Sequence, residues 1–447
     1  MEQEDMMRFL GVIFNSFCLL VILAGCSLFD KEQPAPREVV NEEGVVIEKK
    51  PIWKVDLYDD TKDLVWSFLS PILYDDMVIT PSSLLDTDRS WALWAFTIDE
   101  GKKIWSWAEP NKQSWSNQLR GSGKVSNLWI EKEYNGYNAD NFYAIDLNSG
   151  ETVWSQNRPG SWAGDVFVYG DKYYYAQFPM EAPYYGRYCA VYEGDVYSTD
   201  HEIYLVPETD SIRLSPNNHL GFVDNPLVFE GEDAVQYMLI PFSEYQLEPG
   251  TEFPTHYGNL YMALYDMDAK EYVYSKALVA TEVQALVDEV PMIYEDRLIL
   301  FNIRDEVIAF DLYTGDVVWQ NHYDQGAFSM ILVNSVLVMS QQLGDETYAY
   351  GLDPETGQQL WVRPSGGGAS DIQELNGVVY WKDRGDASLY AVDGLTGELI
   401  WRLGDPDPES NSWWKSDGVA VLPGENGEKG RIFASSHLRF YCFEAAR

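Results

Sequence analysis

A repeated thirteen-residue pattern is the feature that most constrains what this chain can fold into. Its clearest copy is residues 142–154, with Asp146, Gly150 and Trp154 at fixed spacing. Two β-prone runs flank Asn148-Ser149-Gly150, whose residues favour a tight turn, so each copy predicts a β-hairpin. The pattern, written Ala-x-Asp-x-x-Ser/Thr-Gly-x-x-x-Trp, recurs in full at Ala309, Asp311, Gly315, Trp319 and at Ala391, Asp393, Gly397, Trp401.

Weaker copies extend the series. Gly351 replaces only the alanine in the copy with Asp353, Gly357 and Trp361. Two decayed copies are Asp266 to Tyr274, with Lys270 in the glycine place, and Asp99 to Trp105, which is expected to have lost two turn residues. Intervals of about 40 to 50 residues predict one closed array of repeats instead of several domains.

The two ends of the array complete each other. Ile52 to Val55 reads as the last strand of a repeat with nothing before it, and Leu438 to Phe443 reads as a third strand with nothing after it. Their pairing in one blade would remove an exposed sheet edge. Apolar hairpins upstream of the copies bring the number of blades to eight, with Tyr188 to Tyr192 and Glu202 to Val206 as outer strands of a degenerate third blade.

The predicted fold is therefore all-β: an eight-bladed β-propeller of four-stranded antiparallel blades, closed by the N- and C-terminal strands. The alternative is seven blades with a large insertion between Trp154 and Tyr274.

The N-terminus has a separate character. An apolar run from Phe9 to Leu23 ends in Leu-Ala-Gly-Cys26 and is shorter than the ~18 apolar residues of a spanning helix. Leu-Ala-Gly-Cys resembles the lipobox of bacterial lipoproteins, which implies that Cys26 becomes a lipidated N-terminus. The expected division is a signal peptide at 1–25, a flexible tether at 26–50 and the propeller at 51–447. The acidic start before Arg8 departs from the lipobox pattern, and a start at Met6 or Met7 would remove it.

Charge and cysteine usage narrow the function classes. The net charge of −40 repels phosphate backbones, which excludes nucleic acid as a partner and favours cations or basic protein surfaces. Cys18 leaves with the signal and Cys26 is acylated, so Cys189 and Cys442 remain, and both are expected to be small buried residues that form no disulfide. Gly366-Gly367-Gly368 lacks the following helix and lysine of a phosphate loop.

The repeated residues are expected to join neighbouring blades. The tryptophan ring should pack against the small alanine and the turn peptide of the next blade, while its N–H finds an acceptor. The aspartate should accept N–H groups of its own turn. We therefore assign a structural, non-catalytic docking role to Trp105, Ala144, Gly150, Trp154, Ala309, Gly315, Trp319, Gly357, Trp361, Ala391, Gly397 and Trp401.

These residues resemble the tryptophan-docking motif of quinoprotein-dehydrogenase-like propellers, the pyrroloquinoline-quinone (PQQ) type repeat, over about residues 51–444. The dehydrogenases of that superfamily carry an adjacent Cys-Cys disulfide beside the quinone and hold calcium. This sequence has no adjacent cysteines and no positions that map onto the calcium ligands, so no cofactor and no metal are expected. Other members keep only the scaffold, among them lipoprotein subunits of the outer-membrane β-barrel assembly machinery.

A second set of aromatics falls where the chain crosses from one blade to the next. They are Phe68, Trp115, Trp162, Phe328, Trp413 and Trp414. One interpretation is that they wedge between blades; the other is a partly exposed collar that stacks on sugar rings or anchors a partner, with Trp413-Trp414 the most exposed pair.

Three functions remain open from the sequence. The preferred one is a monomeric, membrane-anchored, non-catalytic scaffold for protein–protein interaction in the bacterial cell envelope, in the outer membrane on its periplasmic or exterior face. The alternatives are a carbohydrate- or ligand-binding surface lipoprotein and, less favoured, a quinone-dependent dehydrogenase.

Overall fold

The structure is a computed structural model. It describes residues 38–40, 45–57, 70–84, 90–108, 119–134, 139–159, 166–177, 190–205, 219–223, 226–246, 258–283, 291–303, 306–323, 327–341, 347–365, 370–383, 386–404, 414, 418–436 and 438–447. Within these ranges the chain forms strands and turns and no helix. Accordingly, no helix in the described part has the length and hydropathy needed to cross a membrane. The expected Cys26 lipid site and the signal peptide lie outside the described residues.

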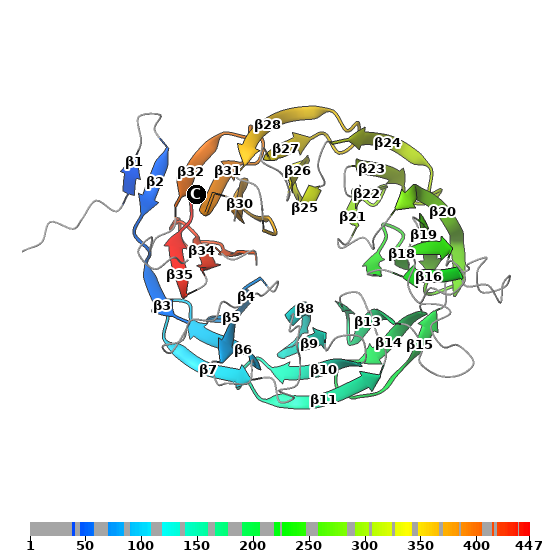
Figure 1. Ribbon diagram of the computed structural model, residues 1–447, viewed down its shortest axis with the longest axis horizontal. Helices are drawn as coiled ribbons and strands as arrows, with labels where there is room; N and C mark the ends of the chain where they lie inside the picture. The colour runs from blue at the N-terminus through cyan, green and yellow to red at the C-terminus, as the bar shows by residue number, and fades with distance from the viewer. Residues whose placement is uncertain are drawn as a thin grey trace, which may run out of the picture.

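Eight sheets stand around one axis and form a ring (Figure 1). This confirms the predicted eight-bladed propeller and excludes the seven-bladed alternative. The first three blades are β4 (Ile72–Tyr74), β5 (Met77–Leu84), β6 (Ser90–Thr97), β7 (Lys103–Ala108); β8 (Leu119–Val125), β9 (Leu128–Tyr134), β10 (Ala139–Asp146), β11 (Thr152–Pro159); and β12 (Phe167–Tyr169), β13 (Lys172–Gln177), β14 (Ala190–Asp195), β15 (His201–Leu205).

The fourth blade carries an extra strand, because β16 (His219–Val223) and β17 (Leu227–Glu230) both pair with the long β18. Blades four to six comprise β16, β17, β18 (Gln236–Gln246), β19 (Gly258–Asp266), β20 (Glu271–Val283); β21 (Met292–Tyr294), β22 (Leu298–Ile303), β23 (Glu306–Asp311), β24 (Val317–His322); and β25 (Ala327–Val333), β26 (Val336–Gln341), β27 (Thr347–Leu352), β28 (Gln359–Ser365).

The eighth blade closes the ring with strands from both ends of the chain. The seventh blade is β29 (Gln373–Leu375), β30 (Val378–Asp383), β31 (Ser388–Asp393), β32 (Leu399–Leu403), and the eighth is β33 (Ala420–Leu422), β34 (Arg431–Ser435), β35 (Arg439–Glu444) with β3 (Trp53–Asp56). β3 runs antiparallel to β35, with Trp53 opposite Cys442. The predicted closure is confirmed, because β3 completes the eighth blade as its fourth strand.

Part of the segment expected to be a flexible tether forms a hairpin instead. β1 (Glu38–Val40) pairs with β2 (Val46–Lys49), and β2 lies parallel to β32 with Val46 opposite Trp401. Figure 1 shows this hairpin outside the ring beside β32. The prediction is wrong for these residues because Val45, Val46 and Ile47 form an apolar, β-branched run that the charged composition of the segment conceals.

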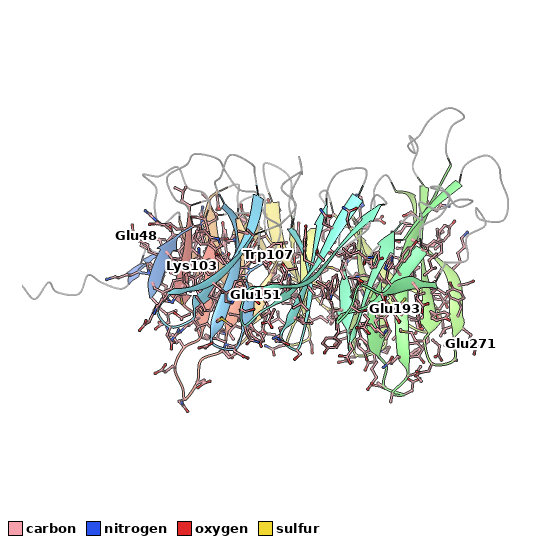
Figure 2. The ribbon with its side chains drawn as sticks, turned by 90° about the horizontal axis from the view of Figure 1, so that it is seen from below. Glu48, Lys103, Trp107, Glu151, Glu193 and Glu271 are labelled. Carbon is pink, nitrogen blue, oxygen red and sulfur yellow. The ribbon has the colours of Figure 1, made fainter. Side chains whose placement is uncertain are left out.

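The core lies between the faces of neighbouring blades. Each blade alternates side chains toward its two neighbours, so that β30 is buried at every position from Val378 to Asp383. One cluster joins Tyr380, Trp401 and Tyr441 across the seventh and eighth blades. Seen edge-on in Figure 2, the strands run between the two faces of the ring, with Lys103 and Trp107 on the outer strand β7.

Candidate functional site

The repeated tryptophans join each blade to the next through one recurring hydrogen bond. In five joints the indole Nε1 of an outer strand donates to a backbone carbonyl in the β-turn of the following blade. The pairs are Trp53 to Ile98 at 2.8 Å, Trp105 to Leu147 at 3.0 Å, Trp154 to Val196 at 2.9 Å, Trp319 to Pro354 at 2.8 Å and Trp361 to Gly394 at 3.0 Å. The indole thus satisfies its only donor while its ring fills the joint.

The turn glycine is required by both backbone and ring. Gly150 has φ of 71°, and a Cβ there would lie 2.5 Å from Cε3 of Trp105. Gly397 has φ of 70°, and its Cβ would lie 2.7 Å from the ring of Trp361. A side chain at either position would therefore be strained and would also push the docked ring away. In the copy that contains Asp311, Gly315 lies under Tyr274 and Ala277 instead of a tryptophan.

The aspartate of each copy organises its own turn. Asp146 Oδ1 accepts hydrogen bonds from the N–H groups of Asn148, at 2.7 Å, and Ser149, at 3.2 Å. The same pair of bonds forms at four further positions: Asp266, Asp311, Asp353 and Asp393. These carboxylates thus hold the turn on which a tryptophan docks.

The first copy is intact, in contrast to the expected loss of two turn residues. Gly101 N donates to Thr97 O at 3.0 Å, as Gly150 N donates to Asp146 O at 2.7 Å. Thr97 therefore holds the aspartate position, and its hydroxyl accepts from Lys102 N at 3.0 Å. The prediction failed because the sequence register was anchored on Asp99, two residues too late.

The small residue of the motif serves the tryptophan of its own blade. Ala144 lies opposite Trp154 across one hairpin, Ala309 opposite Trp319, and Ala391 opposite Trp401. Where glycine replaces the alanine, a Cβ on Gly351 would clash with Nε1 of Trp361, its partner across the hairpin. The expectation that this alanine receives the ring of another blade is therefore corrected.

Tyrosines replace tryptophan at two joints. Tyr204 of β15 packs in one cluster with Met267, which follows the turn aspartate of the fourth blade. Tyr274 of β20 covers Gly315, and burial raises the pKa of its hydroxyl well above the usual range. In the turn of the fourth blade, which begins at Asp266, Lys270 takes the glycine position and has φ of 58°. The motif thus decays in composition around the ring while its geometry persists.

The joint between the seventh and eighth blades (the closure joint) contains a docking turn assembled from Glu444 and Lys49, which are distant in sequence. Glu444 lies opposite Arg431 at the position that Asp393 holds opposite Val378, so it takes the aspartate place. Lys49 precedes Trp53 by the same four residues that separate Gly150 from Trp154. The Lys49 ammonium lies 3.9 Å from Glu444 and 6.0 Å from the centre of the Trp401 ring, with its side chain 4% exposed.

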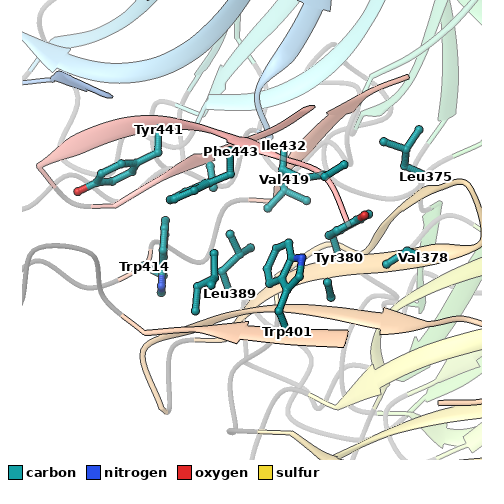
Figure 3. Packing of buried hydrophobic residues seen from close by; sticks show 14 residues of the cluster. Leu375, Val378, Tyr380, Leu389, Trp401, Trp414, Val419, Ile432, Tyr441 and Phe443 are labelled. Carbon is teal, nitrogen blue, oxygen red and sulfur yellow. The ribbon is translucent and has the colours of Figure 1, made fainter. Parts of the chain in front are cut away.

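Trp401 is buried at this joint but docks differently from the other tryptophans. It is 2% exposed, and its Nε1 has no hydrogen-bond partner among the described residues. Instead its ring packs on Tyr380, with ring centres 5.6 Å apart, as Figure 3 shows. At this joint Lys49, four residues before Trp53, takes the place that glycine holds in the other turns.

Charged side chains are also buried in the last blades. Lys382 is 1% exposed and its Nζ donates to the carbonyl of Ser435 at 3.2 Å and to the Ser435 hydroxyl at 3.3 Å. Asp383, on the opposite face of β30, accepts from Ser365 at 3.3 Å. Because burial of an unpaired charge is costly, these contacts fix the register of the seventh and eighth blades.

The C-terminal residue contributes an ion pair to the seventh blade. Arg447 Nη2 lies 2.6 Å from Oδ2 of Asp393. Burial of the Asp393 carboxyl acts to raise its pKa, but the bonds from Arg447 and from Thr396 outweigh burial and lower the pKa. The carboxylate therefore stays ionised at neutral pH, as its role in the turn requires.

Two of the six residues of the candidate aromatic collar lie within the described ranges. Phe68, Trp115, Trp162 and Trp413 lie outside the described residues, and Phe328 lies within the strand β25 instead of before it. Trp414 is 1% exposed and packs edge-on against Tyr441, with ring centres 5.6 Å apart. Its expected exposure is wrong: apolar neighbours from β31 and β35 enclose it, as Figure 3 shows, so it belongs to the joint.

Cys442 lies in β35 within the joint between the eighth and first blades. It is a free thiol, fully buried, and burial raises its pKa to about 12. Cys189 lies outside the described residues. Across the described ranges, no three His, Cys, Asp or Glu side chains come together in a group that could hold a metal ion.

Sequence reasoning missed three docking positions. Trp53 docks on Ile98, Tyr204 packs beside Met267, and Lys49 completes the closure turn. The four-residue spacing from Lys49 to Trp53 was a usable signal, because it matches the glycine-to-tryptophan spacing. Asp195, which accepts from Tyr197 N at 2.8 Å, was missed because no tryptophan follows it.

A protein-family model described as outer membrane protein assembly factor BamB matches residues 252–379 and 334–428. A comparison with curated protein sequences found no match. The part of the chain from 252 to 428 thus carries the repeat signal that the motif copies display.

Solved structures share the ring at low sequence identity. Quinohemoprotein alcohol dehydrogenase from Comamonas testosteroni is 11% identical, with 88% of this chain and 76% of that chain covered and a TM-score of 0.59. Sqt1 from Saccharomyces cerevisiae is 9% identical, covering 87% and 97%, with a TM-score of 0.55. The computationally designed Ika8 protein is 10% identical, covering 86% and 100%, with a TM-score of 0.53.

A dehydrogenase, a yeast protein and a designed protein have similar TM-scores with this chain, so these likenesses establish the fold alone. The eight closed blades thus make the chain a β-propeller, and its repeats over residues 252–428 are similar to those of the BamB family model.

Proposed function

We propose that this protein is a non-catalytic scaffold for protein–protein interaction in the bacterial cell envelope, anchored by a lipid on Cys26. The observation that carries the proposal is the match of residues 252–428 to a model described as an outer membrane protein assembly factor. The role assigned to the motif adds support. In the described copies the repeated tryptophans and aspartates join blades or hold the turns of these joints, so the repeat serves the ring and not a reaction.

The anchor follows from the sequence of the N-terminus. Leu-Ala-Gly-Cys26 after an apolar run places a single thiol where a lipoprotein would be acylated. From Cys26 to β1 is a stretch of twelve residues, which spans at most roughly 40 Å when extended. The outer strand of the seventh blade, β32, would then be held close to the membrane surface.

The test is affinity purification of the tagged full-length protein after membrane extraction. We expect one or more envelope proteins at stoichiometric amounts, and no such protein with an unrelated tagged lipoprotein prepared in the same way. A preparation that contains only this chain contradicts the scaffold role.

The anchor is tested separately with Cys26→Ala. The variant should move from the membrane fraction to the soluble fraction, and the mature wild-type protein should show an acyl mass on its first residue. Membrane fractionation that Cys26→Ala leaves unchanged contradicts the anchor and leaves the scaffold role untouched.

A further inference from the structure

The outer strands of the blades share an exposed apolar residue directly before the docking aromatic. Its exposed fraction is 44% at Ile104, 53% at Val153, 42% at Val273, 49% at Val318 and 49% at Leu360. These strands are the last members of their sheets, so no further described strand pairs with their outer edges. Such edges are ready templates for another strand.

One of these edges is occupied by the chain itself. β2 adds in parallel to β32, with Val46 opposite Trp401. Ile400, the residue that corresponds to Leu360, is half-buried there and packs in the same cluster as Val46. The β32 edge thus shows what kind of segment the outer edge of a blade can bind. This segment is extended, runs parallel to the outer strand, and is aliphatic where it meets the docking tryptophan.

The β28 edge carries two exposed aliphatic side chains close together. Leu360 and Val362 are 49% and 47% exposed and, two residues apart, lie on the same side of the strand. The turn that receives Trp361 adds Leu395, which is 49% exposed. β28 has no acidic residue, although the chain carries a net charge of −40.

We propose that the outer edge of β28 is a docking site for an extended segment of a partner protein, which adds to the blade as β2 adds to β32. The segment carries branched aliphatic side chains over Leu360 and Val362. Because the exposed Glu398 lies in the adjoining turn, the segment ends in lysine, as β2 ends in Lys49. This inference rests on the proposed scaffold function and names its contact surface.

The direct test uses a fluorescein-labelled peptide that copies residues 44–50 as the probe, and fluorescence anisotropy with the full-length protein. We expect saturable binding that Leu360→Asp with Val362→Asp weakens at least about tenfold. Val153→Asp on β11 is the matched control, because Val153 is as exposed and holds the same position. Absence of binding, or equal binding by the β28 variant, contradicts the proposal.

Amide hydrogen exchange separates the two edges that the peptide could occupy. Added peptide should slow exchange in β28, residues 359–365. Slowing confined to β32 would mean that the peptide merely replaces β2, and this result contradicts the proposal.

The affinity purification described above distinguishes failure of the site from failure of the function. If the Leu360→Asp, Val362→Asp variant still retains its envelope partner, the β28 site is wrong and the scaffold role stands. If the peptide binds β28 but no envelope partner is recovered, the docking edge stands and the scaffold role fails.

Discussion

At the scale of single residues, the joints of the ring depend on tryptophan rings that pack on glycines, which have no side chain. Trp361 donates its indole N–H to Gly394 O and rests on Gly397, while Gly351 leaves room for it across its own hairpin. Three backbone positions therefore accommodate one tryptophan: one accepts its N–H and two leave space for its ring. This explains why the motif keeps glycine or alanine at fixed distances from the aromatic.

Gly397→Ala tests this pairing, with Gly170→Ala as control. Both glycines have positive φ, 70° and 59°, but nothing lies within 4 Å of a Cβ at Gly170, whereas the Trp361 ring lies 2.7 Å from one at Gly397. Gly170→Ala should cost about 1 kcal/mol of unfolding free energy and Gly397→Ala about 3 kcal/mol. Chemical denaturation measures both. Equal losses would mean that backbone conformation alone selects the glycine.

Arg447→Ala tests the ion pair with Asp393 through its pH dependence. The folded-state pKa of Asp393 is lowered, so its stabilising effect is present above the unfolded pKa of about 3.9 and is lost as pH falls through the folded value. The variant should lose about 1 kcal/mol at pH 7, because the arginine is half exposed and screened. The difference from wild type should vanish in acid. A loss that is the same at pH 7 and below pH 3 contradicts the pairing.

At the scale of elements, the sequence predicted what is repeated and failed where the repeat is interrupted. The eight blades and the pairing of β3 with β35 followed from hairpins that bury apolar residues at alternate positions. The hairpin of β1 and β2 did not follow, because its three-residue apolar run has no periodic partner and pairs with a strand about 350 residues away. Long-range pairing of a short strand leaves little local signal.

The burial of Trp414 was missed for a related reason. Polar neighbours in the chain, Asn411, Ser412 and Lys415, suggested an exposed loop. In the structure the tryptophan contacts residues of β31 and β35, which are distant in sequence. Sequence neighbours report the character of a loop, whereas burial depends on which blade the side chain meets.

Lys49→Ala tests the split docking turn of the closure joint, with Lys50→Ala as control. Lys49 covers Trp401 and pairs with Glu444, while Lys50 is exposed. Lys49→Ala should lower the free energy of unfolding by about 1 kcal/mol through lost packing and the lost ion pair, and Lys50→Ala should change it by less than about 0.5 kcal/mol. Indistinguishable melting curves for the two variants contradict a role of Lys49 in closure.

Truncation extends this test to whole strands. Removal of residues 1–57 deletes β3 and leaves β35 with an open edge, whereas removal of residues 1–44 keeps β2 and β3 in place. The shorter protein should melt at a far lower temperature, because a propeller without its closing strand loses one face of a joint that contains Trp53, Phe433 and Phe440. Equal melting temperatures would contradict closure by β3.

At the scale of the whole molecule, charge and apolar surface are separated. The turns carry the acidic residues of the motif, whereas five of the eight outer strands, β7, β11, β24, β28 and β32, contain no Asp or Glu; the other three, β3, β15 and β20, do contain acidic residues. A net charge of −40 therefore coexists with a rim of exposed aliphatic residues and open strand edges. This separation suits a scaffold that repels its own copies through the turns and contacts a partner through the rim.

The likeness of the ring to quinohemoprotein alcohol dehydrogenase makes the chemistry of the molecule a matter for direct measurement. The motif residues of this chain are engaged in joining blades: indoles donate to turn carbonyls and carboxylates accept turn N–H groups. They are therefore evidence for the fold and carry no preference for a quinone. The sequence also lacks the adjacent cysteines of the quinoprotein dehydrogenases, since Cys18, Cys26, Cys189 and Cys442 are all separated.

The purified protein should accordingly bind no PQQ. Absorbance titration with PQQ in the presence of calcium should give no saturable spectral change, and no dye should be reduced with alcohols or sugars as donors. A quinoprotein alcohol dehydrogenase reconstituted in the same buffer is the positive control. Saturable binding in the micromolar range, reversed by removal of calcium, would show that the ring holds a cofactor through residues outside the repeat, and the molecule would then have to be assigned to the enzymes of its fold.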